Sequence, residues 1–408
     1  MEDLLTQLVV LLYGYGEIQF ENLFVDGTKI EANANKYTFV WKKAVLKNEA
    51  RMQKKLGTLM DRIVPEKEFP DFVTVEMMEE ILTDLKEKID KEGIVFVHGS
   101  GRRKTQPQRD YEALQEFKER QKKYDSYKAL LGNRNSFSKT DPDATFMRLK
   151  DDHMRNAQLK PAYNLQVAVE SEYIVGVDLS SHRSDMRALI PFLDNLEVSY
   201  GRRYQNLICD AGYESEENYS YLGGKEIKPF IKPSNYEYSK TRKFQREMEF
   251  RLSMDYLSDQ DAYRCKAGRL LTYRKDNQRV SASGFKSTSR IYECESCDGC
   301  AYLGKCYRGK YSKTIHVSKS FDHYRAKSLA NITSEEGTLL RVNRSIQAEG
   351  VFGVLKWNYG FQRFLTRGAV NVKTECLLLA FSFNINKLHH RIQNGRLGLA
   401  LFPLKKAG

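Results

Sequence analysis

The chain has 408 residues, of which 41% are hydrophobic and 29% are charged. It contains 9 prolines and 26 glycines, which are ordinary counts and exclude a wholly disordered or collagen-like chain. Lysine and arginine outnumber aspartate and glutamate by 66 to 53, and the resulting net charge of +13 favours a polyanion such as nucleic acid as partner. Net charge alone does not exclude the alternative of a soluble basic protein that has no polyanion partner.

No segment of the sequence predicts a membrane span. The longest apolar runs, such as Leu377–Phe381, are far shorter than the roughly 18–20 residues that a spanning helix needs. The first residues, Met1–Asp3, are acidic where a signal peptide is basic, so we expect a cytoplasmic protein. In that compartment the seven cysteines, five of them between Cys265 and Cys306, favour metal or thiol chemistry over disulfides.

The predicted elements begin with an apolar helix over Leu4–Tyr13. A strand over Phe20–Asp26 follows, and we expect Gly27 to close it. From Thr38 to about Tyr127 the chain is highly charged, with apolar residues at helical spacing. This helical segment separates the first strand from a second part that is rich in strands.

The second strand-rich part begins near Pro161. Tyr163–Val169 and Tyr173–Val177 are separated by a short polar turn and predict a hairpin. A helix is expected over Asp185–Leu196, and a strand over Asn206–Asp210 that again ends in an aspartate.

A second long segment runs from Gly224 to about Thr333 and is first basic and aromatic, then cysteine-rich. Lysines and aromatic residues interleave in Lys225–Arg246, a pattern that suits phosphates and exposed bases but equally suits a solvated loop anchored by aromatic residues. Helices are predicted over Ser334–Gly360 and Val372–His390.

Three acidic residues stand out by position. Asp26 and Asp210 each end an apolar strand, where ligands bind at the rim of an open α/β sheet. Glu349 lies on a predicted helix, and Lys356 shares its face seven residues later. Carboxylates that converge from separate elements can hold a pair of divalent cations for phosphoryl transfer. The alternative for each acid, considered by itself, is that its carboxylate caps a turn or a helix and binds no metal.

The cysteines form a second pattern. Cys294, Cys297, Cys300 and Cys306 are closely spaced, and tetrahedral zinc needs four such ligands. Cys294, Cys297 and Cys300 follow one another at intervals of three residues, and a tetrahedral site built on all three would be tight. Cys265 is therefore an alternative ligand in place of Cys297 or Cys300. The other interpretation is a loop of reduced, free thiols.

Taken together, these motifs resemble those of the DDE transposases of bacterial insertion sequences, in a branch with a cysteine-rich insertion after the second aspartate. The resembling segments are Val25–Ile30 for the first aspartate, Ile208–Tyr213 for the second, and Glu349 with Lys356 for the glutamate helix. Arg363 and Arg367 stand where that region usually carries arginine. The resemblance extends from about residue 20 to residue 390.

The chain departs from this family in two ways. The usual glutamate signature has an arginine four residues before the glutamate, whereas Ser345 stands there and Arg344 lies one residue early. Val342 stands where a tyrosine is usual. Relatives usually carry a sizeable helical region before the first aspartate, and only 25 residues precede Asp26, so we expect a copy shortened at its N-terminus.

The resemblance implies a ribonuclease-H-like α/β core with a mixed sheet, a helical insertion and a cysteine-rich, zinc-binding insertion. The expected parts are a residual N-terminal helix (1–19), the first part of the core (20–37), the helical insertion (38–150), the second part of the core (151–223), the basic and cysteine-rich insertion (224–333), and C-terminal helices with the glutamate (334–408).

The resemblance also implies a DNA transposase that acts as endonuclease and strand transferase at the ends of an insertion sequence. Asp26, Asp210 and Glu349 would hold Mg²⁺ or Mn²⁺. The residues expected to contact DNA are Lys356, Arg344, Arg363 and Arg367. Transposon ends and target DNA are the expected partners, with a homodimer assembled on DNA in the bacterial nucleoid. A non-catalytic DNA-binding remnant and a stand-alone nuclease are the alternatives.

Overall fold

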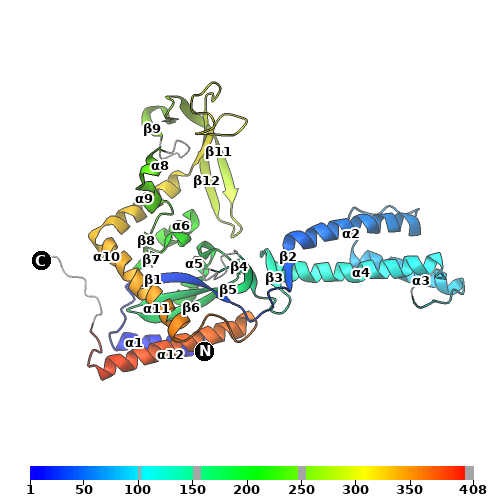
Figure 1. Ribbon diagram of the computed structural model, residues 1–408, viewed down its shortest axis with the longest axis horizontal. Coiled ribbons are helices and arrows are strands. Elements are labelled where there is room, and N and C mark those ends of the chain that lie inside the picture. The colour runs from blue at the N-terminus through cyan, green and yellow to red at the C-terminus, as the bar shows by residue number, and fades with distance from the viewer. Residues whose placement is uncertain (100–102, 150–157, 247–253, 400–408) are drawn as a thin grey trace. The chain divides into compact units, whose positions relative to one another are not determined.

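The computed structural model describes residues 1–99, 103–149, 158–246 and 254–399 (Figure 1). The chain divides into two compact units. One contains Met1–Thr28, Asn164–Gln362 and Lys373–Gly408, and we call it the core unit. The other contains Lys29–Tyr163 and Arg363–Val372, and we call it the helical unit.

A mixed sheet of six strands is the centre of the fold. Its order is β4-β5-β1-β7-β8, and β6 pairs with β5. The strands are β1 (Asn22–Glu31), β4 (Thr145–Arg148), β5 (Leu159–Glu170), β6 (Tyr173–Ser180), β7 (Asn206–Cys209) and β8 (Lys228–Ile231). β1, β7 and β8 are parallel, whereas β4, β5 and β6 are antiparallel. This arrangement confirms the predicted mixed α/β class and the predicted hairpin.

Two details of the sheet differ from the sequence-based expectation. β1 does not end at Gly27 but continues to Glu31. A Cβ at Gly27 would lie 2.5 Å from Gln166 Nε2 and 2.6 Å from Asp185 Oδ1, so this glycine permits a close approach inside the strand. The second difference is β8, which forms beside β7 although its four residues were expected in the basic insertion. A strand this short, flanked by lysines, carries too little periodic signal to be recognised.

Helices pack on the sheet of the core unit. They are α1 (Glu2–Gly14), α5 (Leu189–Tyr200), α6 (Glu216–Gly224), α9 (Lys319–Thr333), α10 (Glu335–Arg344) and α12 (Ala369–Gln393). Gly176 lets α5 approach β6, because a Cβ there would lie 2.4 Å from Leu196 Cδ2. The buried Asn384 of α12 accepts the N–H of Ile174 at 2.8 Å and donates to its carbonyl at 2.7 Å, so it satisfies backbone groups of β6.

The segment expected to be one helix over 334–360 contains two π-helical turns. α10 is followed by the π-helix η5 (Ser345–Glu349), the short α11 (Gly350–Gly353) and a second π-helix, η6 (Val354–Asn358). A π turn closes hydrogen bonds between residues five apart, so the α-helical spacing that placed Lys356 on the face of Glu349 does not hold across this region. Sequence periodicity alone gives no signal for such a turn.

A five-stranded antiparallel sheet forms the cysteine-rich part of the core unit. Its order is β13-β12-β11-β10-β9. The strands are β9 (Asp255–Leu257), β10 (Ala262–Arg264), β11 (Leu270–Val280), β12 (Lys286–Cys294) and β13 (Thr314–Val317). Tyr263, Leu271 and Tyr292 are among its buried residues. Shorter elements of the core unit are η1 (Asp185–Arg187), η2 (Ala211–Tyr213), α7 (Tyr236–Ser239), α8 (Arg242–Arg246) and η4 (Ser258–Gln260).

The helical unit contains three long helices, as the spacing of its apolar residues predicts. They are α2 (Lys42–Ile63), α3 (Val75–Lys91) and α4 (Gln106–Leu131). Leu56, Met78, Ile81 and Leu114 are in their shared core. β2 (Phe39–Trp41) and β3 (Ser136–Ser138) pair at one end of these helices. None of the helices in the described ranges combines the length and the apolar character that a membrane span requires.

Candidate active site

Asp26 and Asp210 come from neighbouring parallel strands. β1 pairs with β7 so that Phe24 lies opposite Ile208, and each aspartate follows two residues later. The shared register brings both carboxylates to the same level of the sheet. The N–H of Gly27 donates to Asp26 Oδ1 at 2.9 Å, and the N–H of Gly212 donates to Asp210 Oδ1 at 2.7 Å. The backbone after each aspartate therefore orients its carboxylate.

Arg344 connects the first aspartate to the glutamate. Its Nη1 lies 3.4 Å from Asp26 Oδ2, and its Nη2 lies 2.9 Å from Glu349 Oε1. The π-helix η5 explains how an arginine five residues before the glutamate can face it, because a π turn brings residues i and i+5 together. Arg344 therefore reaches Glu349 although Ser345 stands at the position four residues before the glutamate.

Asp185 is a fourth carboxylate beside these acids, and it was not among the predicted site residues. Its Oδ1 accepts hydrogen bonds from Asn164 Nδ2 at 2.7 Å and Gln166 Nε2 at 3.0 Å. A Cβ at Gly212 would lie 3.4 Å from its Oδ2. Asn164 and Gln166 are polar residues within the apolar strand β5, where both are fully buried. That polar pair in an apolar run is a sequence signal that could have drawn attention to Asp185.

The environment of these acids is strongly negative. Burial, together with the neighbouring Asp210 and Asp26 carboxylates, raises the pKa of the Cys209 thiol well above its ordinary value. Burial is also the main cause of the raised pKa of Tyr213, with contributions from Cys209 and Asp185. Such a site favours a bound cation, and the Arg344 guanidinium supplies one positive charge.

A polar groove of about 550 Å³ opens beside Asp210 and Arg344. Its other lining residues are Cys209, Ala211, Lys232, Pro233, Ser234, Glu237, Thr338, Arg341 and Val342. The basic and aromatic segment after β8 contributes to this lining. Its Tyr236 ring has Lys240 Nζ at 3.6 Å and the Arg341 guanidinium at 5.7 Å from its centroid. The groove thus combines carboxylates at one side with cations that suit a phosphate backbone.

The remaining predicted DNA contacts are divided between the two units. Lys356 is half-buried in η6 of the core unit. Arg363 and Arg367 belong to the helical unit, where Arg367 Nε donates to the Asn33 carbonyl at 2.7 Å. Closeness in the sequence is therefore not enough to predict that these three cations form one cluster.

The donor types suit the expected ions, although the side chains are not arranged as a closed site. Within the described ranges, no group of three or more histidine, cysteine or acidic side chains is positioned to hold a metal ion. Asp26, Asp210 and Glu349 offer carboxylate oxygens, which hard cations such as Mg²⁺ prefer. Arg344 forms ion pairs with two of these three acids, Asp26 and Glu349, and partly neutralises their negative charge.

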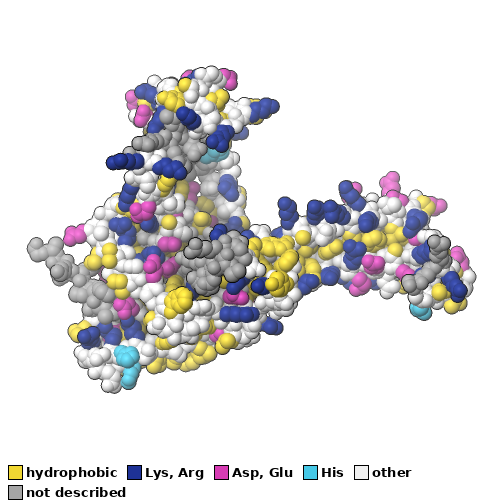
Figure 2. Space-filling view, in the orientation of Figure 1, with side chains coloured by type: hydrophobic (Ala, Val, Ile, Leu, Met, Phe, Trp, Pro, Cys, Tyr) yellow, Lys and Arg dark blue, Asp and Glu magenta, His cyan; other side chains and the backbone are white. Residues whose placement is uncertain are grey.

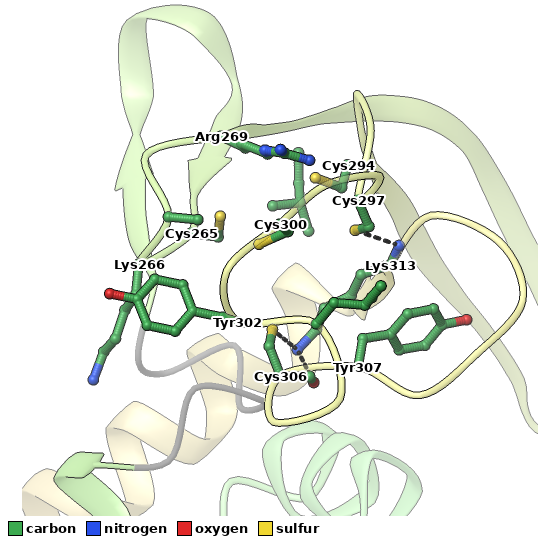
Figure 3. Close-up of a pocket in the computed structure, with 13 residues that line it drawn as sticks. Cys265, Lys266, Arg269, Cys294, Cys297, Cys300, Tyr302, Cys306, Tyr307 and Lys313 are labelled. Atoms are coloured by element: carbon green, nitrogen blue, oxygen red, sulfur yellow. Dashed lines mark hydrogen bonds between the residues drawn. The ribbon is translucent and has the colours of Figure 1, made fainter.

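The five cysteines of the second pattern line one cavity of about 30 Å³ (Figure 3). The space exceeds the roughly 10–15 Å³ that a single water needs. Like the acids, however, the described cysteine side chains are not arranged as a closed metal site. Figure 3 shows the thiols of Cys265, Cys294, Cys297 and Cys300 directed toward a common space. Burial, with the neighbouring Cys297, raises the pKa of Cys294 to about 12.

Lys313 is a buried cation at this cavity, with an exposed fraction of only 6%. Its backbone N–H donates to Cys297 Sγ at 3.4 Å, and its Nζ donates to Cys306 Sγ at 3.4 Å. Its Nζ also donates to the Cys306 carbonyl oxygen at 3.4 Å, so the buried ammonium group has two acceptors on one cysteine. All seven cysteines of the chain are free thiols.

Comparison with known proteins adds one finding to this geometry. Residues 264–389 match the family described as a transposase DDE domain, and the match confirms the predicted resemblance to DDE transposases. The matched segment includes the cysteine cavity, Arg344, Glu349 and Lys356, whereas Asp26 and Asp210 precede it. Comparisons with curated proteins and with solved structures found no match.

Proposed function

We propose that this protein is a DDE-type DNA transposase that cleaves DNA at the ends of an insertion sequence and transfers the freed strand to a target. The observation that carries the proposal is the pair of aspartates on neighbouring parallel strands, with Glu349 connected to Asp26 through Arg344. The family match at residues 264–389 supports the same class of enzyme.

The proposed core is ribonuclease-H-like. Its support is the strand order, in which an antiparallel group of β4, β5 and β6 adjoins the parallel strands β1, β7 and β8. In such a sheet a ligand binds beyond the carboxyl ends of the parallel strands. Asp210 follows the end of β7 directly, and the polar groove opens at that residue.

A pair of Mg²⁺ or Mn²⁺ ions, when bound, would polarise the attacking and leaving oxygens of the phosphodiester. In this proposal Asp26 and Asp210 orient their carboxylates through the backbone N–H groups of Gly27 and Gly212. Lys232 and Arg341 line the groove and neutralise phosphates of the DNA. Arg344 exchanges its carboxylate partners for a phosphate when DNA enters.

The variants Asp26→Asn and Asp210→Asn test this proposal. Each removes a charge with little change of shape, so we expect loss of DNA nicking and strand transfer with unchanged DNA affinity. Asp194→Asn is the matched control, because Asp194 is an exposed aspartate whose carboxylate accepts a hydrogen bond from Tyr221 at 2.6 Å. Full nicking by either site variant would refute the catalytic assignment.

The same assay separates the two alternatives. A stand-alone nuclease would nick DNA without joining the new 3′ end to a target. A non-catalytic remnant would bind DNA and produce neither nicks nor joined products. The proposed transposase gives both products, and both depend on Asp26 and Asp210.

We also propose that the cysteine cavity binds one structural zinc ion. The five thiols around one cavity and the buried Lys313 support it. Zinc takes four thiolate ligands, so one of the five is spare. The proposed ligands are drawn from Cys294, Cys297, Cys300 and Cys306, with Cys265 as the alternative to Cys297 or Cys300.

Metal analysis of the purified, reduced protein tests the zinc proposal. We expect about one zinc per chain, and we expect a chelator to lower the thermal stability, because structural zinc contributes to folding directly. Cys376→Ser is a cysteine control outside the cavity, with Cys294→Ser as the site variant. A folded, reduced preparation without zinc would show that the cavity holds free thiols.

A further inference from the structure

The exposed face of helix α2 is strongly basic. α2 contains seven lysines and arginines and only two acidic residues. Lys43, Lys47, Arg51, Lys54 and Lys55 are all exposed, and most of them follow one another at intervals of four residues. Residues four apart share a helix face, so these five cations form one continuous face. Figure 2 shows lysine and arginine side chains gathered over this helix.

The packing of α2 fixes which way this face points. Its buried residues include Val45, Met52, Leu56 and Leu59, which lie on the opposite side of the helix and pack toward the core of the helical unit. In the described part of the chain, none of the five exposed cations forms an ion pair. The acidic Glu49 of α2 is buried and pairs with Lys128 at 2.6 Å. Its charge therefore does not neutralise the basic face.

The neighbouring helix α3 has the opposite character. It carries six acidic residues and three lysines, and its lysines lie among acids, as in the ion pair between Lys86 and Asp90 at 2.6 Å. Positive charge is thus concentrated on α2 rather than spread over the helical unit. A surface of this kind attracts a polyanion, and its length suits the phosphates of a nucleic acid.

An aromatic groove adjoins the basic face. It has a volume of about 290 Å³, and its lining residues are Phe39, Val40, Trp41, Ala44, Val45, Asn48, Arg120, Lys123, Tyr124, Tyr127 and Lys139. Ala44 and Asn48 lie three residues before Lys47 and Arg51 in α2, and residues three apart are neighbours on a helix surface, so the groove begins at the edge of the basic face. The Phe39 side chain is 50% exposed although it is a large aromatic group. Aromatic rings flanked by cations are the arrangement on which unpaired bases stack.

We propose that the basic face of α2 binds the DNA backbone and that the adjoining aromatic groove takes an unpaired base. This surface lies in the helical unit, and the carboxylate site in the core unit plays no part in the argument. The inference extends the proposed function by adding a DNA-binding surface that needs no catalytic residue. The DNA-binding surface on α2 can therefore be refuted while the catalytic assignment of the carboxylates holds. The catalytic assignment can likewise be refuted while the DNA-binding surface holds.

The test of the basic face compares two triple variants of the full chain, each also carrying Asp26→Asn to prevent cleavage. The first contains Lys47→Gln, Arg51→Gln and Lys54→Gln on α2. The matched control contains Lys86→Gln, Lys88→Gln and Lys91→Gln on α3, which removes the same charge from the same unit. Binding of a fluorescent DNA duplex is measured by anisotropy between about 50 and 200 mM salt, the range over which phosphate contacts change affinity strongly.

For the α2 variant we expect the log–log salt slope to become shallower by about 2.7, because each duplex phosphate contact contributes about −0.9. The α3 variant should keep the parental slope. Equal slopes in the two variants would overturn the proposal. So would an α2 variant that loses binding to anionic phosphatidylserine vesicles but keeps its affinity for DNA.

The groove is tested with Phe39→Leu, which keeps an apolar side chain and removes the half-exposed aromatic ring of the groove. We expect at least about a fivefold loss of affinity for a duplex with an unpaired overhang, since a stacked base contributes measurably to binding. A blunt duplex should bind unchanged. Lys123→Gln at the groove is the second variant if Phe39→Leu melts at a lower temperature. An equal effect on both DNAs in both variants would refute the base-binding role.

Discussion

At the scale of single residues, Arg344 has the most informative position. Its guanidinium contacts Asp26 and Glu349, two of the three acids proposed to hold the metal ions. A guanidinium and a divalent cation therefore compete for the same carboxylate oxygens. In this site the arginine limits the mutual repulsion of the acids before a cation binds.

This competition predicts the effect of Arg344→Gln on metal affinity without DNA. Mn²⁺ should bind the variant about tenfold or more tightly, because the loss of roughly 1.4 kcal/mol of competing interaction corresponds to tenfold. The measurement is Mn²⁺ binding by electron paramagnetic resonance. Arg341→Gln in the same groove is the control and should leave the affinity unchanged. Weaker Mn²⁺ binding in Arg344→Gln would show that the arginine supports the site instead.

Glu170 is a second residue with a defined electrostatic role. Its carboxylate accepts backbone N–H groups of Gln19 at 3.0 Å, Phe20 at 3.2 Å and Glu21 at 3.3 Å, and it thereby fixes the chain just before β1. Burial raises the pKa of the Glu170 carboxyl above its ordinary value of 4.5, despite these hydrogen bonds. Charging this buried group therefore has a cost in the folded state.

The sign of the resulting pH dependence follows from proton binding. Above pH 4.5 the unfolded chain has released the Glu170 proton while the folded protein still retains it, so stability falls as pH rises through this window. Glu170→Gln cannot ionise, so its melting temperature should lack this part of the decline. The measurement is thermal unfolding at a series of pH values that begins near the ordinary carboxyl pKa of 4.5 and rises from there. Parallel pH profiles for the two proteins would contradict the assignment.

At the scale of elements, the turn between α9 and α10 sets the direction of the segment that carries Arg344. Gly337 lies in the first turns of α10, and a Cβ there would lie only 1.9 Å from the Asn331 carbonyl oxygen. That oxygen belongs to the backbone, so the helix cannot accept a side chain without moving. The α9–α10 contact therefore depends on glycine at this position.

Gly337→Ala should consequently destabilise the protein by about 1–3 kcal/mol, the usual cost of overpacking. Gly350→Ala is the matched control, because its backbone is helical and a Cβ there would meet no atom within 4 Å beyond the backbone of its own helix. The control should be neutral or stabilised by about 0.4–1 kcal/mol. Both effects are measured by chemical unfolding. A stable Gly337→Ala variant would mean that α9 and α10 can separate without cost.

At the scale of the whole molecule, the net charge of +13 is distributed unevenly. In the helical unit it concentrates on α2, whereas α3 is acidic. In the core unit, cations of the segment after β8 and of α10 line the polar groove beside Asp210. Each unit thus presents its own cationic surface, and we expect the DNA affinity of the full chain to depend on both.

Elements with local signals could be predicted from the amino-acid sequence alone. The helix over 4–13, the hairpin around Ser171 and Glu172, the helical character of the charged segment and the strands that carry or precede Asp26 and Asp210 all follow from short-range periodicity. Asp210 was recognisable because it directly follows a strand, where ligands bind at the edge of a parallel sheet, whereas Asp26 lies within β1 and not at its end. The cysteine pattern likewise predicted the cluster that the cavity brings together.

Features that depend on contacts between distant residues became visible only in the folded chain. The position of Asp185 beside the other acids depends on Asn164 and Gln166 of β5, which donate hydrogen bonds to it from a distant part of the chain. The contact of Arg344 with Glu349 requires a π turn, which leaves no periodic signal in the sequence. The strand β8 likewise forms by pairing with β7, and the direction of the basic face of α2 is set by the buried residues on the other side of that helix. Local patterns specify elements, whereas the alignment of side chains across strands and helices is set by packing that a single sequence does not display.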